Sequence, residues 1–199
     1  MGEPIRFDEI SREGGIIAQR FMPGQQVILG PNALMAELTE QDFSFRCIPA
    51  WKQLEIPGGG RWYAVSLRRF ILSFGVGDMI SYSVDAYPGQ AFRLGFFSQV
   101  DFQVAHLKGF QRWMRGRETV SCDSLATAMH GLSAEAVQLA VCSVLRPYSN
   151  FGACTRSKPQ LEAAIEEVLF DILFENGLCV RPHTYRIVNF AKPTIAAIE

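Results

Sequence analysis

Residues 92–104 read FRLGFFSQVDFQV and alternate between apolar and polar side chains along almost their whole length. The even-numbered residues are apolar apart from Ser98, and the odd-numbered residues are mostly polar or charged. Successive side chains of an extended chain point to opposite faces, so a period of two predicts a β-strand with one buried face. One covered and one open face is typical of a strand in an antiparallel sheet.

Two odd-numbered residues of this stretch depart from the alternation. Phe97 is apolar on the polar side, and we expect it to contact another layer or another subunit. It is therefore our candidate residue for self-association. Gly95 has no side chain to pack, which indicates a bulge or a close approach of another backbone segment.

Short strands are predicted before this stretch. Residues 25–29 (QQVIL) are followed by Gly30-Pro31-Asn32, which indicates a strand and then a turn. Residues 33–37 have both helical and strand propensity, and we favour a strand that completes a hairpin. The loop at residues 57–60 precedes residues 62–74, which are rich in strand-forming side chains.

Helices are predicted after residue 108. Residues 110–114 have helical spacing, and Ser121 or Asp123 can cap a following helix that Pro147 ends. Gly131 is a candidate interruption of that helix, and Ser133 can cap a further helical segment after it.

A last helix and a last strand complete the chain. Apolar residues recur every three or four positions over residues 161–173, and Asn176-Gly177 is a favourable stop for this helix. Residues 185–189 predict a final strand. This order of elements predicts an α+β fold, an antiparallel sheet with packed helices. We expect one domain over residues 20–190, with an extension at 1–19 and a tail at 191–199.

The charge balance gives no global field that would attract a polyanion. Nineteen basic residues face twenty acidic ones, so the formal net charge is -1 and we expect no nucleic-acid partner. One segment nevertheless gathers four cations around Phe110 and Trp113. These cations are Lys108, Arg112, Arg115 and Arg117. They are candidates for contact with lipid headgroups or phosphate, although a solvated helix face explains them as well.

The sequence contains no recognisable catalytic, cofactor or metal motif. Its three histidines lack the spacing of a zinc site, and Gly75-Val76-Gly77-Asp78 lacks the third glycine of a dinucleotide loop, so we interpret it as a turn. We therefore predict no metal, no cofactor and no enzymatic activity. One rival hypothesis stays open, a nucleophilic thiol at Cys122 or Cys154 that a distant histidine activates.

We expect the chain to be cytoplasmic. Five scattered cysteines without a C-x-x-C pair indicate reduced thiols, the segment at residues 1–13 lacks the layout of a secretory signal, and uninterrupted apolar runs are short. Arg6 occupies the position where myristoylation needs Ser or Thr.

Several consecutive blocks together resemble the SPFH (band 7, stomatin-like) domain, in particular its bacterial virion-core-protein-like branch. The blocks are residues 25–29, 75–82, 92–104, 110–113, 161–173 and 175–180. Their order and spacing extend the resemblance over roughly residues 20–190.

The resemblance implies a non-catalytic, oligomerising scaffold that organises protein or membrane-associated assemblies. The partner would be further copies of the chain, with a peripheral membrane or protein partner as an addition. The chain lacks the N-terminal membrane segment and the long coiled coil of stomatins, which favours a soluble assembly or dependence on a partner. The alternative is a peripheral lipid- or protein-binding module that acts as a monomer.

Overall fold

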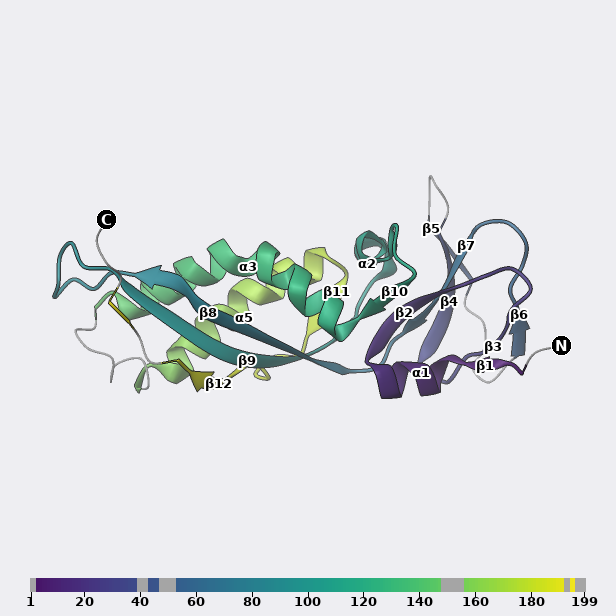
Figure 1. The fold of residues 1–199 in the computed structure, drawn as a ribbon, viewed down its shortest axis with the longest axis horizontal. Coiled ribbons are helices and arrows are strands. Elements are labelled where there is room, and N and C mark those ends of the chain that lie inside the picture. The colour runs from purple at the N-terminus through teal and green to yellow at the C-terminus, as the bar shows by residue number, and fades with distance from the viewer. Residues whose placement is uncertain (1–2, 39–42, 47–52, 148–155, 192–193, 196–199) are drawn as a thin grey trace. The chain divides into compact units, whose positions relative to one another are not determined.

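The computed structural model describes residues 3–38, 43–46, 53–147, 156–191 and 194–195 (Figure 1). The chain groups into two compact units, each made of separate segments. Unit 1 contains residues 1–70, 102–125 and 174–179, and unit 2 contains residues 71–101, 126–173 and 180–199. Helices and mainly antiparallel strands occur in both, which confirms the predicted α+β class. The predicted domain boundaries stay a prediction.

An antiparallel sheet in the order β10-β2-β7-β4-β5 forms the centre of unit 1. Its strands are β10 (Thr119–Ser121), β2 (Ile16–Phe21), β7 (Arg61–Ser66), β4 (Ala33–Leu38) and β5 (Phe43–Arg46). The strand predicted over residues 33–37 is thus confirmed as β4. A smaller sheet joins β1 (Ile5–Arg6), β3 (Gln26–Ile28) and β6 (Gln53–Glu55). The strand predicted over residues 25–29 is confirmed as β3.

Helices contact both faces of the large sheet. Neighbouring residues of β7 point to opposite sides, and Trp62 packs in one core cluster with Phe7 of α1 (Phe7–Gly14). Tyr63 points the other way, and its hydroxyl reaches the carbonyl oxygens of Met114 and Arg117 at 2.9 and 2.8 Å. These carbonyls belong to α2 (Leu107–Met114) and the turn after it. β7 is buried on both faces for this reason.

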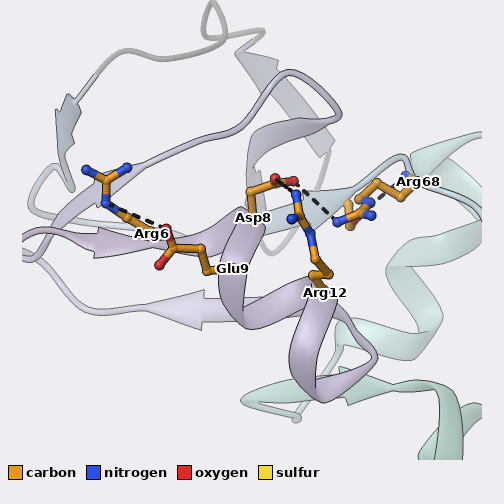
Figure 2. A network of polar contacts seen from close by, with 6 residues as sticks. Arg6, Asp8, Glu9, Arg12 and Arg68 are labelled. Carbon is orange, nitrogen blue, oxygen red and sulfur yellow. Dashed lines mark hydrogen bonds and ion pairs between the residues drawn. The ribbon is translucent and has the colours of Figure 1, made fainter.

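The first residues of the chain take part in this core. Phe7 and Ile17 are fully buried, although the sequence analysis assigns residues 1–19 to an extension. Asp8 of α1 accepts a hydrogen bond from Arg12 at 3.3 Å and lies 3.8 Å from Arg68 (Figure 2). The β carbon of a side chain at Gly30 would lie 2.6 Å from that of Asp8, so glycine makes room for the ion pair.

The start of α2 meets the end of α5 (Lys158–Glu175) within unit 1. His106 caps α2, because its Nδ1 accepts a hydrogen bond from Gly109 N–H at 3.1 Å, and its Nε2 donates to the carbonyl of Phe174 at 2.9 Å. Gly177 has a φ of 80°, in the left-handed region. The helix stop predicted at Asn176-Gly177 is confirmed.

Most of β9 (Phe92–Val104), which matches the predicted strand, belongs to unit 2 and forms the centre of its sheet. It pairs with β8 (Phe70–Tyr82) on one side. On its other side lie β11 (Leu178–Val180), β12 (Arg186–Phe190) and β13 (Thr194–Ile195). The even-numbered residues 94–104 are all buried, which confirms the predicted period of two.

Two predictions about breaks in regular structure are wrong. β8 runs through the predicted turn at residues 75–78. α3 (Cys122–Leu145) runs through Gly131 without a break, because one glycine inside a helix costs only about 1 kcal/mol. Ser121 caps α3, since its Oγ accepts from Ser124 N–H at 3.2 Å. α3 and α5 run beside the β8–β9 pair in unit 2 (Figure 1).

α3 is long and apolar enough to cross a membrane, with 33% of its most apolar window buried. The sequence analysis expects no span, and a core helix of a water-soluble protein meets the same requirement. Localisation therefore stays a prediction.

Replacement of Gly177 tests the junction between α2 and α5. A β carbon at this position would lie 2.2 Å from the amide nitrogen of Phe110, and L side chains rarely adopt its φ. We expect Gly177→Ala to lower the free energy of unfolding by about 2 kcal/mol or more, measured by urea denaturation. Gly58→Ala is the matched control, because nothing lies within 4 Å of its β carbon. Equal stability of the two variants would contradict this geometry.

Candidate functional site

The face of the unit 2 sheet that carries the odd-numbered residues of β9 is open to solvent around Phe97. The Phe97 side chain is 41% exposed, although its neighbours Phe96 and Ser98 are buried. Across the strand pair, the nearest atom to a β carbon built on Gly75 is Cδ2 of Phe97, at 3.7 Å. The Phe97 ring therefore lies beside a strand position that has no side chain.

Other apolar side chains are exposed in the same sheet. Ser73 Oγ accepts a hydrogen bond from Gln99 Nε2 at 3.2 Å, so odd-numbered residues of β8 share the open face with odd-numbered residues of β9. Ile71 therefore belongs to this face, and it is 58% exposed. We call Ile71, Ser73, Gly75, Phe97 and Gln99 the open sheet face.

An irregularity in β12 exposes one more apolar residue. The register shifts between Ile187, which pairs with Ser98, and Asn189, which pairs with Phe97. Val188 is the extra residue and is 56% exposed. This register shift lies in β12 opposite Ser98 and Phe97, and not at Gly95, where the sequence indicates a bulge or a close approach of another backbone segment.

The predicted basic and aromatic cluster separates into two faces of α2. Phe110 is fully buried and Trp113 is nearly so, with the Trp113 indole N–H donating to the carbonyl of Asn176 at 3.0 Å. The exposed residues are Lys108, Arg112 and Arg115, at helical positions i, i+4 and i+7. The aromatic rings are therefore not available to stack on a ligand, and a basic helix face remains.

The pairing of β2 with β7 brings two further arginines close to the end of α2. Arg20 pairs with Tyr63 across β2 and β7, and Arg61 lies two residues from Tyr63 on the same face. Burial raises the pKa of Tyr63, and the charges of both arginines oppose that rise. Arg117 follows α2 in the exposed turn whose carbonyl the Tyr63 hydroxyl reaches. Sequence reasoning misses Arg20 and Arg61 because they come from separate strands.

Two of the described thiols, Cys122 and Cys142, are poorly suited to nucleophilic catalysis. Burial, together with the charge of the neighbouring Asp123 carboxylate, raises the pKa of Cys122 to about 11. Burial also raises the pKa of Cys142, whose Sγ donates to the carbonyl of Ser81 at 3.4 Å. Both are protonated at neutral pH. Cys154, the other candidate nucleophile, and Cys47 lie outside the described residues.

No protein-family model matches the chain, and no curated protein matches it. Among the residues that the structure describes, no group of three His, Cys, Asp or Glu side chains could hold a metal ion. The open sheet face and the basic face of α2 are therefore the features from which we argue function.

Proposed function

We propose that the chain is a non-catalytic scaffold of the SPFH (band 7) type whose copies associate through the open sheet face. The exposure of Phe97 carries this proposal. Exposed apolar residues that share one surface mark interaction sites, and Ile71 is exposed on the same face as Phe97. The resemblance of consecutive sequence blocks to the SPFH family supports an assembling role.

The composition of the open sheet face suits contact with a second copy. Sheets pack face to face at about 10 Å, with side chains of the two faces interdigitating. The empty position at Gly75 leaves space beside the Phe97 ring for a partner side chain. In a two-fold arrangement each copy contributes the same surface, so every favourable contact occurs twice. Fully burying one Phe side chain contributes about 1.5–3 kcal/mol.

Replacement of Phe97 tests this association. We expect the unmodified protein to form dimers or larger assemblies as its concentration rises, measured by light scattering after size exclusion. In Phe97→Ser we expect the dissociation constant to rise at least about tenfold, because a ring is lost from each copy. Leu139→Ser is the matched control, since Leu139 is 65% exposed on α3 and lies outside the open sheet face.

Two results would count against the proposal. A strictly monomeric unmodified protein at every concentration would exclude self-association in solution. Equal loss of assembly in Phe97→Ser and Leu139→Ser would place the contact elsewhere.

A second candidate function is peripheral binding to anionic lipid through the basic face of α2. Within the described segments, no carboxylate pairs with Lys108, Arg112 or Arg115. Cations that no acidic neighbour compensates attract anionic headgroups, by about 1 kcal/mol each near the surface.

The triple variant Lys108→Gln, Arg112→Gln, Arg115→Gln tests lipid binding. We expect the unmodified protein to sediment with phosphatidylserine vesicles at low salt, and the triple variant to sediment at least about tenfold less. The control carries Arg69→Gln, Arg93→Gln and Arg181→Gln, three exposed arginines that are not part of α2 and whose replacement removes the same charge. If both variants lost sedimentation equally, the binding would depend on the net charge of the protein and not on the basic face of α2.

A further inference from the structure

One edge of the unit 2 sheet has outward-facing backbone groups. The backbone N–H and C=O groups of the odd-numbered residues of β9 point towards the side on which β12 lies. The carbonyls of Gly95 and Asp101 accept hydrogen bonds on that side from Ala191 and Arg181 N–H, at 2.9 and 3.0 Å. The backbone groups of its even-numbered residues therefore point towards β8. Ser98 Oγ accordingly donates to the carbonyl of Phe74, at 3.3 Å.

The same alternation fixes the direction of the backbone groups in β8. The backbone groups of even-numbered residues such as Phe74 point towards β9, so the N–H and C=O groups of Ile71, Ser73 and Gly75 point away from the sheet. All three residues are exposed. In the described part of the chain, β9 is the only strand that pairs with β8.

The opposite edge of the sheet is closed by two carboxylates of α5. Glu166 Oε1 accepts from the N–H groups of Thr184 and Tyr185 at 3.1 and 3.4 Å. Glu162 Oε1 accepts from Ile187 N–H at 2.7 Å. Charged side chains that occupy strand N–H groups prevent an additional strand from pairing there.

β8 has little comparable protection. The described side-chain contact with an outward backbone group of this strand is at its far end, where Cys142 Sγ donates to the Ser81 carbonyl at 3.4 Å. The two edges of one sheet thus differ, and within the segments that the structure describes no strand pairs with the outward backbone groups of Ile71, Ser73 and Gly75.

A pocket lies next to this open edge. Its volume is about 240 Å³, and Phe74 and Ile80 of β8 line it together with Ala134, Val137 and Gln138 of α3. Ala134 and Gln138 are exposed, so the pocket is open to solvent. Its lining is mainly apolar, and its size suits a side chain better than a whole cofactor.

We propose that β8 and α3 form a binding groove for an extended peptide segment of a partner protein. The segment adds as a strand to the outer edge of β8, where the backbone groups of Ile71, Ser73 and Gly75 form its hydrogen bonds. One of its apolar side chains enters the pocket between β8 and α3. In this mode of recognition, backbone hydrogen bonds supply affinity, and a pocket for alternate side chains supplies specificity.

The chemistry of the groove defines the partner segment. The segment is extended over about five residues, because the open edge of β8 spans Ile71 to Gly75. Its side chains alternate in direction, as in any strand. The residue that enters the pocket is apolar, because Phe74, Ile80 and Val137 supply most of the lining, to which His130 and Ser133 add polar groups. The groove uses the outward backbone groups of Ile71, Ser73 and Gly75, whose positions also belong to the open sheet face, but it does not use Phe97 and does not rest on self-association.

Peptides selected from a random phage-displayed library on the intact protein test the groove. The selected sequence, made as a labelled synthetic peptide, is titrated by fluorescence anisotropy into the protein and three variants. Ser73→Pro removes one outward N–H and preserves the pairing with β9. Ala134→Phe fills the pocket, and Ser73→Thr is the matched control that retains the N–H group.

We expect at least about tenfold weaker binding to Ser73→Pro and to Ala134→Phe, and unchanged binding to Ser73→Thr. Far-ultraviolet circular dichroism checks that each variant is folded. Failure to select any peptide, or equal binding to Ser73→Pro and the unmodified protein, would overturn the proposal. Self-association that Ser73→Pro abolishes and Phe97→Ser leaves intact would also overturn it, because a second copy would then occupy the edge.

Discussion

Hydrogen bonding along both edges of β9 is the constraint on which unit 2 depends. Because β8 pairs with one edge and β11, β12 and β13 with the other, the strand cannot slip by one residue without turning its buried face to solvent. The register that buries Phe96 and Ser98 thereby exposes Phe97. It also points the backbone groups of Ile71, Ser73 and Gly75 outwards, so the open sheet face and the open edge have one cause.

Unit 1 shows how one short helix provides both stability and a surface. The buried side of α2 carries Phe110 and Trp113, and the tight approach of Gly177 fixes its start. The same helical period that buries these rings presents Lys108, Arg112 and Arg115 to solvent. A basic surface on α2 is therefore a consequence of how α2 packs.

Local patterns allowed much of the fold to be predicted. The strand at 92–104 and the stop at Gly177 follow from period and from glycine chemistry, which neighbouring residues determine. Features that depend on register could not be predicted: the position of Arg20 beside Tyr63, the carboxylates that close β12, and the pocket under α3. The turn expected at residues 75–78 was wrong because tertiary pairing with β9 overrides the preference of glycine for turns. The SPFH resemblance stays a prediction from the sequence blocks.

The central claim is that copies of the chain meet at Phe97. To test whether this contact exists, Phe97 is replaced by a photo-crosslinking phenylalanine analogue, and in a parallel sample Leu139 is replaced by the same analogue. Both samples are irradiated and analysed by denaturing electrophoresis. We expect covalent dimers from position 97, with the crosslink mapped by mass spectrometry to residues of the open sheet face in a second copy. Crosslinked dimers from position 139 alone, or crosslinks from position 97 that stay within one chain, would contradict it.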